Sequence, residues 1–194
     1  MLRVMALAVC LGATNLLFAR ATADEEPIIT LTTSIYELAG ANNQISLVIG
    51  AVEDMWIDVD CGFGAEEYKL NALDTAGTLI YCTVDKNATI KIYGEKPEAI
   101  TYINAEGCYL TSVDLTKLTN LDILNLNHNQ LADIDLSKNT KIRALYVSDN
   151  PFTESTPLVI GEKDSLILLE IPMVGYLDPN FDLTKYPKMQ SFDA

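Results

Sequence analysis

The stretch LDILNLNHNQL at residues 121–131 decides the fold, because its pattern recurs through the second half of the chain. ITYINAEGCYL at 100–110 and IRALYVSDNPF at 142–152 match it position by position, at intervals of 21 residues. After a three-residue insertion, LILLEI at 166–171 starts a fourth copy, and MQSF at 189–192 belongs to a truncated fifth. A repeat of this length predicts one small structural unit per copy, stacked on its neighbours.

The repeat has the form L-x-x-L-x-L-x-x-[NC]-x-L, which is that of a leucine-rich repeat. Its short strand alternates, so its leucines are expected to point into a solenoid core. The chain then bends away at Cys108, Asn129 and Asn150. An Asn side chain both donates and accepts hydrogen bonds there, which satisfies backbone groups that the bend leaves unpaired. We therefore expect these three residues to form a structural ladder. Cys108 is interpreted as a structural residue of that ladder in preference to a reactive thiol.

Residues 24–96 have a different pattern, with short β-branched stretches separated by Gly, Asn and Asp. They predict strands at 28–33, 45–49, 55–60, 78–84 and 88–93. A small antiparallel β-sandwich of five to seven strands fits best, and an elaborate N-terminal cap is the alternative. The chain is thus predicted to be mainly β, with a β-sandwich-like N-terminal domain (24–96) followed by a short leucine-rich-repeat solenoid (97–194). In either case residues 24–96 should cover the open end of the solenoid.

Residues 1–23, MLRVMALAVCLGATNLLFARATA, have the layout of a cleavable secretory signal peptide. We therefore expect export to the periplasm, the cell surface or the medium. An integral membrane protein is not expected, because no other stretch is long enough to span a bilayer. The net charge of −14 argues against binding nucleic acid.

Three cysteines follow the signal peptide, so at least one of them has no partner within the chain. The pattern leaves two alternatives for Cys61 and Cys82, a disulfide across neighbouring strands or two buried thiols.

The order of parts resembles that of secreted leucine-rich-repeat proteins of anaerobic gut bacteria. There a β-rich, immunoglobulin-like or PKD-like domain leads directly into 21-residue repeats. The segments that carry the resemblance are Ile28–Ser34, Met55–Gly62, Ile90–Gly94, LTSVDLTK at 110–117 and IDLSKNTK at 134–141. That family often carries W-x-D-x-G-D-G, whereas this chain has WIDVDCG at 56–62, so a role of that loop is not carried over. The resemblance implies cell-surface or periplasmic binding, often proposed as adhesion, and no defined reaction.

Catalytic and cofactor motifs are missing from the sequence, whose one histidine is His128. We therefore expect neither enzymatic activity nor a cofactor. Asp58 and Asp60, with Glu53 and Asp54 nearby, are hard oxygen ligands of the kind that hold calcium. The sequence lacks the spacing of a calcium loop, so a solvated strand edge is the favoured interpretation and no metal site is expected.

The candidate binding surface is the concave face, where residues between the core positions of each strand project in columns. Apolar and aromatic groups beside amides fit a protein partner. A glycan is the alternative, because tyrosine rings stack on sugars, and a purely structural envelope component is a third possibility. Beside the columns that contain the candidate residues, a further column consists of Glu106, Asn127, Ser148 and Pro172. The candidate ligand-binding residues are Tyr102, Asn104, Ile123, Asn125, Tyr146, Leu168 and Glu170.

Overall fold

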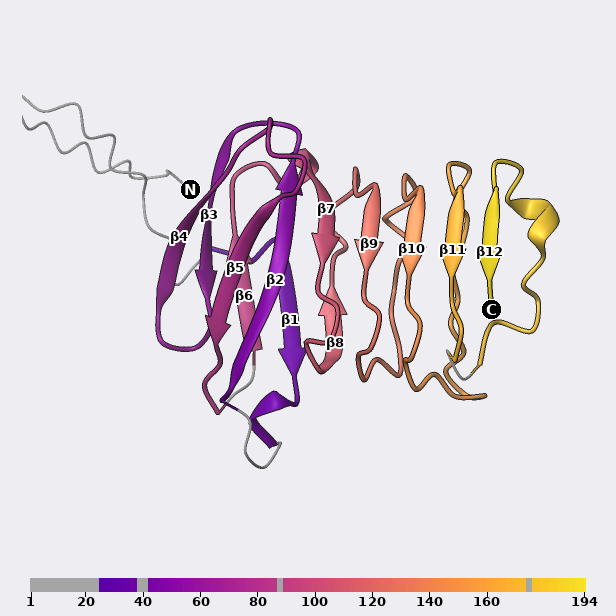
Figure 1. Ribbon diagram of the computed structural model, residues 1–194, viewed down its shortest axis with the longest axis horizontal. Helices are drawn as coiled ribbons and strands as arrows, with labels where there is room; N and C mark the ends of the chain where they lie inside the picture. The colour runs from indigo at the N-terminus through magenta and orange to yellow at the C-terminus, as the bar shows by residue number, and fades with distance from the viewer. Residues whose placement is uncertain (1–24, 38–41, 87–88, 174–175) are drawn as a thin grey trace, which may run out of the picture.

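The computed structural model describes residues 25–37, 42–86, 89–173 and 176–194, which form a mainly β protein (Figure 1). The predicted signal peptide lies outside the described residues. Three short 3₁₀ helices, η1 (Ile35–Glu37), η2 (Pro97–Ala99) and η3 (Leu183–Lys185), accompany the strands. The strands are β1 (Ile29–Thr33), β2 (Gln44–Ala51), β3 (Met55–Asp60), β4 (Ala65–Leu70), β5 (Thr78–Thr83), β6 (Thr89–Tyr93), β7 (Ile100–Asn104), β8 (Leu110–Asp114), β9 (Ile123–Asn125), β10 (Ala144–Tyr146), β11 (Leu168–Glu170) and β12 (Ser191–Asp193).

The first six strands supply most of a two-layer sandwich. One layer is a five-stranded sheet in the order β4-β3-β6-β1-β8, with antiparallel neighbours. Strands β1 and β3 alternate buried and more exposed residues along their length, as expected when one face of a sheet packs on a core. The sandwich predicted from the sequence is therefore present, and strand β4 is an addition to the predicted strands.

The second sheet runs without a break from the sandwich into the solenoid, in the order β12-β11-β10-β9-β7-β2-β5. Strand β7 opens the first repeat and has a different kind of neighbour on each side. It pairs antiparallel with β2, through Ile49 opposite Ile103, and parallel with β9, through Ile103 opposite Leu124. The solenoid is therefore an extension of one sandwich layer, and the row of parallel strands is visible in Figure 1.

The first repeat also returns to the other layer of the sandwich. Strand β8, which follows the bend at Cys108, pairs antiparallel with β1 through Leu31 opposite Val113. The Thr33 hydroxyl donates a hydrogen bond to the Cys108 carbonyl oxygen at 2.7 Å, which closes the same junction. Sandwich and repeats accordingly share one continuous hydrophobic core, from Ile28 to Tyr186.

A column of left-handed residues makes each repeat turn after its strand. Gly107, His128, Asp149 and Met173 hold equivalent positions and have φ values of 65°, 56°, 53° and 58°. This conformation costs nothing for Gly but is unfavourable for the three residues that carry a Cβ. The turn is thus specified by the repeat geometry rather than by local preference.

The ladder positions follow directly after this column. Asn129 Nδ2 donates to the carbonyl oxygens of Ala105, Leu126 and Asn127, and its Oδ1 accepts from the Leu110 amide. The Asn150 amide is buried and repeats this arrangement one turn later, with three carbonyl acceptors and one backbone donor.

Cys108 occupies the first ladder position. Its Sγ donates to the Ser46 carbonyl oxygen of β2 at 3.2 Å, so the side chain ties the first turn to the sandwich. Burial raises the pKa of the Cys108 thiol to about 11. The thiol is therefore protonated at neutral pH.

A second column of buried polar groups, which the sequence pattern did not reveal, lies in the segments that lead from one repeat to the next strand. Asn139 Nδ2 donates to the Leu115 and Leu118 carbonyl oxygens at 2.9 Å. Lys163 takes the equivalent place in the next turn, only 1% exposed, and its Nζ donates to the Leu136 and Ile160 carbonyl oxygens at 3.0 and 2.7 Å.

The two sheets of the sandwich are cross-linked by a disulfide between Cys61 and Cys82, whose Cα atoms are 5.8 Å apart. Cys61 directly follows β3 of the first sheet, and Cys82 lies in β5 of the second. The sequence left open a disulfide or two buried thiols; the structure has the disulfide, which joins the two sheets rather than neighbouring strands of one sheet. Cys108 is the free cysteine among the described residues.

Candidate functional site

The face that the sequence predicts to be concave is formed by side chains that stand in rows across the parallel strands. The strand registers place Tyr102, Ile123, Ala144 and Leu168 side by side in one row. The neighbouring row contains Asn104, Asn125, Tyr146 and Glu170. All eight residues are half-buried, so each presents part of its side chain to solvent.

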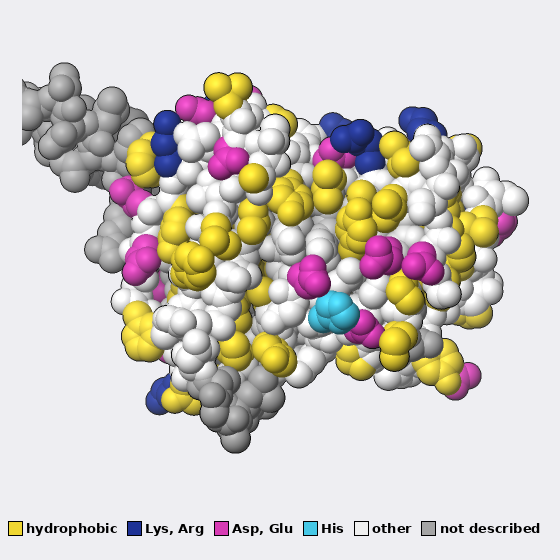
Figure 2. All heavy atoms as spheres, viewed as in Figure 1, with side chains coloured by type: hydrophobic (Ala, Val, Ile, Leu, Met, Phe, Trp, Pro, Cys, Tyr) yellow, Lys and Arg dark blue, Asp and Glu magenta, His cyan; other side chains and the backbone are white. Residues whose placement is uncertain are grey.

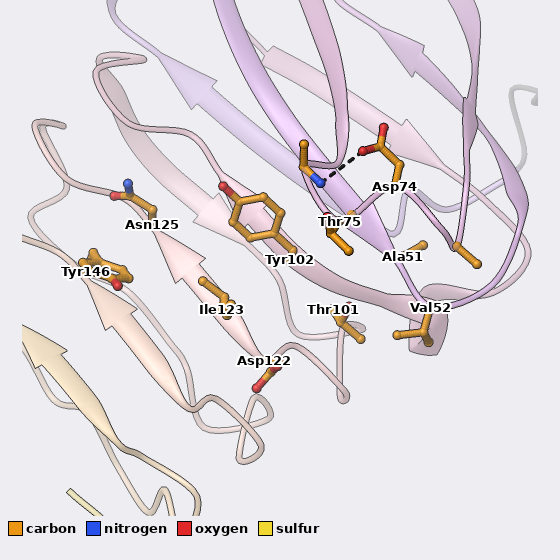
Figure 3. Close-up of a pocket in the computed structure, with 13 residues that line it drawn as sticks. Ala51, Val52, Asp74, Thr75, Thr101, Tyr102, Asp122, Ile123, Asn125 and Tyr146 are labelled. Atoms are coloured by element: carbon orange, nitrogen blue, oxygen red, sulfur yellow. Dashed lines mark hydrogen bonds between the residues drawn. The ribbon is translucent and has the colours of Figure 1, made fainter. Parts of the chain in front are cut away.

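A groove of about 560 Å³ lies where this face meets the sandwich. Its floor includes Tyr102, Ile123, Asn125 and Tyr146, and the loop of residues 72–76 forms the opposite wall. Figure 3 shows the two tyrosine rings and Ile123 on neighbouring strands, with Thr75 and Asp74 across from them. The groove is therefore built jointly by the repeats and by a loop of the sandwich.

The loop is held over the strands by its own hydrogen bonds. The Ala76 and Gly77 amides both donate to Asp74, and the Ala72 amide donates to the Asp54 carboxylate at 2.9 Å. Gly77 has a φ of 78°, and a Cβ at this position would lie 2.7 Å from a methyl group of Val48. Only glycine allows the chain to pass so close to β2.

The Tyr102 ring is positioned by a second glycine. It lies over Gly50, where an added Cβ would approach the Tyr102 side chain to 3.1 Å. Gly50 pairs with Tyr102 across β2 and β7, so the ring covers the bare backbone of the neighbouring strand. This contact holds the ring at the edge of the groove that faces the sandwich.

The other end of the strands carries a polar border. Asn125 Nδ2 donates to Glu106 Oε2 at 3.0 Å, and Asn127 Nδ2 donates to Glu170 Oε1 at 3.3 Å. The Ser148 hydroxyl reaches the same Glu170 oxygen at 3.5 Å. Asn127 and Ser148 were expected to project outward with Glu106 and Pro172, but both are buried. The Ser148 amide donates to Asn127 Oδ1 at 2.7 Å, and both side chains contact Glu170.

His128 belongs to this border and faces two carboxylates. Its Nδ1 is 2.8 Å from Asp149 Oδ2, and its Nε2 is 3.9 Å from Glu106 Oε1. At the opposite rim of the groove, Arg143 forms a two-bond contact with Asp122. The Asp122 hydrogen bond raises the pKa of the Arg143 guanidinium further above its usual value. The rim arginine is thus already paired.

The structure brings some of the predicted residues together and separates others. Tyr102, Ile123, Asn125 and Tyr146 share the groove, whereas Asn104, Leu168 and Glu170 are not among the residues that line it. Sequence reasoning missed the wall at 72–76, since a loop has no periodicity. The signal available was Asp-Thr-Ala-Gly at 74–77, a turn composition, but nothing in it indicates which face the turn overlies.

Metal coordination finds no support in the described part of the chain, where no group of three or more His, Cys, Asp or Glu side chains could hold an ion. Asp60 Oδ1 instead accepts hydrogen bonds from the Gly62 and Gly64 amides at 2.8 and 3.1 Å, and so stabilises the turn between β3 and β4. Among the described residues, no helix is long and apolar enough to cross a membrane.

Comparisons with known proteins give one structural likeness and no family. No family model matches the sequence, and no curated protein matches it. Among solved structures, the chain is similar to the functional domain of InlJ from Listeria monocytogenes, which includes a cysteine ladder, with a TM-score of 0.46 and 22% sequence identity. The match covers 53% of this chain and 22% of the InlJ chain. The resemblance to secreted proteins of gut bacteria therefore rests on the sequence motifs, and the fold on the repeats and sheets described above.

Proposed function

We propose that this chain is a non-enzymatic binding protein that recognises a protein partner through its concave strand face. The observation that carries the proposal is the groove of about 560 Å³ between the 72–76 loop and the strands, with Tyr102, Ile123 and Tyr146 at its floor. Aromatic side chains in a partly enclosed site are typical anchors of protein interfaces. The half-buried asparagines beside them add donors and acceptors that give direction to the contact.

The arrangement of potential catalytic groups supports a binding role rather than a reaction. His128 has carboxylates on both sides, and none of the described residues offers it a hydroxyl or thiol as a hydrogen-bond partner. Cys108 is buried in the ladder, and its raised pKa keeps it as a thiol, which is a poor nucleophile. Neither residue lines the groove. A nucleophile and its base would need to be in mutual contact beside a cavity.

Glycan binding is the second candidate, because two tyrosine rings, Tyr102 and Tyr146, share the groove with Asn125 and Asp74. Rings stack on the apolar faces of sugars, and the polar groups would bond hydroxyls. Protein recognition is favoured, because the floor also carries Ile123 and the rim Val52, which offer a sugar nothing to bond.

The two candidates are separated by testing the full chain on a glycan array and in pull-downs from a surface-protein extract, beside a Tyr102→Ala plus Tyr146→Ala variant. We expect the wild type to retain specific proteins that the double variant loses. Tyr36→Ala is the matched control, since Tyr36 is 47% exposed on η1 and does not line the groove. If the double variant lost only sugar binding, protein recognition would be the wrong assignment. If neither assay detects binding, the remaining interpretation is that the protein is a purely structural envelope component.

We also propose that the chain is exported. The support is the layout of residues 1–23 and the Cys61–Cys82 disulfide, which is typical of oxidising compartments. Protease shaving of intact cells tests surface display. Loss of the protein signal without lysis is expected, and full protection would place the protein inside the envelope.

A further inference from the structure

The concave face is divided into an apolar part and an acidic part. The groove with Tyr102, Ile123 and Tyr146 occupies the side next to the 72–76 loop. Glu106 and Glu170 lie on the other side, as acceptors of the amide hydrogen bonds from the Asn125 and Asn127 side chains. On the face shown in Figure 2, hydrophobic side chains gather beside a group of Asp and Glu side chains around the histidine. A ligand that spans the face must match both parts.

Positive charge is scarce on this surface. Strands β7, β9, β10 and β11 contain no Lys or Arg, and the nearest arginine, Arg143, is engaged by Asp122. The whole chain carries a net charge of −14. Such a field attracts cationic partners and slows the approach of anionic ones.

The carboxylates of the border are both accessible and fixed in place. The side chains of Glu106 and Asp149 are 47% and 35% exposed. The hydrogen bonds from Asn125 and Asn127 hold Glu106 and Glu170 by one oxygen each. Acceptors that are ordered before binding lose little side-chain entropy when a cation arrives.

We infer that the groove and its acidic border together receive an extended basic segment of a partner protein, a refinement that rests on the proposed function. An apolar side chain of the segment lies between Tyr102, Ile123 and Tyr146. Arginine or lysine side chains of the same segment reach the carboxylates of Glu106 and Glu170 on the acidic side of the face. Arginine suits the site best, because its guanidinium also stacks on tyrosine faces within about 6 Å. Nucleic acid and acidic peptides are repelled by the same charges.

The probes are three sets of dye-labelled 12-residue peptides with a shared Leu, Tyr and Ser background. Four variable positions hold Arg and Lys in one set, Glu in the second and Gln in the third. Fluorescence anisotropy with the full chain is measured in 50 and 500 mM NaCl. We expect the basic set to bind tightest and to weaken at high salt, where the screening length falls well below 10 Å.

Two variants assign the binding to its parts. Glu106→Gln plus Glu170→Gln keeps an oxygen acceptor for each asparagine and should weaken the basic set about five- to thirtyfold, since each of the two exposed pairs contributes about 0.5–1 kcal/mol. Glu154→Gln plus Glu162→Gln removes the same charge away from the strands and should change binding less than twofold. Tyr102→Ala should weaken all three sets.

The outcomes separate this inference from the proposed function. Equal binding of the three peptide sets, or equal effects of the two pairs of glutamate substitutions, overturns the basic-segment inference. If Tyr102→Ala still weakens peptide binding in that case, the groove remains a site for a protein partner. Binding that is indifferent to Tyr102→Ala, or no binding by any peptide set, removes the support for both.

Discussion

Replacing Lys163 with Met tests whether a charged amine is buried in the repeats. Burial lowers the pKa of Lys163 from 10.5 to about 8, and the carboxylate of Asp135 opposes this only in part. The ammonium is therefore disfavoured in the folded state by roughly 3 kcal/mol, at about 1.4 kcal/mol for each unit of pKa. Its hydrogen bonds to the Leu136 and Ile160 carbonyl oxygens offset that cost. Each such bond contributes about 1.5–3 kcal/mol.

The lowered pKa sets the direction of the pH dependence. Below pH 8 the amine is charged in both the folded and the unfolded chain, so the wild type carries the full cost of burial. Between pH 8 and 10.5 the folded protein has released the proton while the unfolded chain still binds it, and stability from Lys163 rises with pH. Between pH 7.5 and 10 this rise amounts to about 2 kcal/mol.

The assay is urea unfolding of both proteins at pH 7.5 and pH 10, followed by far-ultraviolet circular dichroism. At pH 7.5 we expect Lys163→Met to be folded, because the lost hydrogen bonds and the relieved burial cost are of similar size. At pH 10 the wild type should gain about 2 kcal/mol relative to the variant. Titrating tyrosines and Cys108 are common to both proteins and cancel in this difference.

Lys138→Met is the control for this experiment, since it removes the same charge from an exposed position in the same region. An unchanged difference between wild type and Lys163→Met at the two pH values would refute the reasoning. The amine would then be hydrated rather than enclosed.

Three further predictions concern stability. Asn150→Ala should lower the unfolding free energy by about 2–4 kcal/mol, because buried backbone groups lose their partners, while the exposed Asn180→Ala should cost under 1 kcal/mol in the same urea titration. Met173→Gly should raise the melting temperature, because it relieves about 1 kcal/mol of backbone strain at a left-handed position and removes a side chain that is 81% exposed. A lower melting temperature would contradict the presence of that strain. Cys61→Ser plus Cys82→Ser should cost about 3 kcal/mol, as expected for a cross-link spanning 21 residues, and wild type in reductant should match it.

The repeats could be predicted from the sequence because their signal is local and multiple. Each copy carries its apolar positions and its turn residue in register, so the strands around Leu124, Leu145 and Leu169 follow from spacing alone. The sandwich-like part before the solenoid was predicted from a different local signal, the short β-branched stretches separated by Gly, Asn and Asp.

Strand β4 was missed because it lies at an edge. Its sequence, AEEYKL, is charged at three positions and has little apolar alternation. An edge strand with one exposed side needs few apolar residues and benefits from charge, which discourages pairing with other chains. The pairing of β8 with β1 was likewise out of reach, since it joins Thr30 to Asp114 and no local pattern records such a partner.

The buried polar column shows a different limit. A lysine in a sequence normally indicates the surface, and only alignment with the preceding repeat puts Lys163 at the position of Asn139. Prediction of the groove from the sequence meets the same limit. Tyr102, Ile123 and Tyr146 follow from the strand periodicity, but the loop that faces them is placed by Gly77, whose close approach to β2 is a tertiary fact.

The double pairing of β7 has a consequence for how the molecule opens. In an isolated repeat array, unfolding can start at either end and spread one unit at a time. Here β7 is hydrogen-bonded to β2 as well as to β9, so the described turns form a series that is anchored at one side. Amide hydrogen exchange should therefore be slowest at β7 and become faster toward β12. The groove lies beside the anchored strand, so we expect it to stay formed while the more distant turns open.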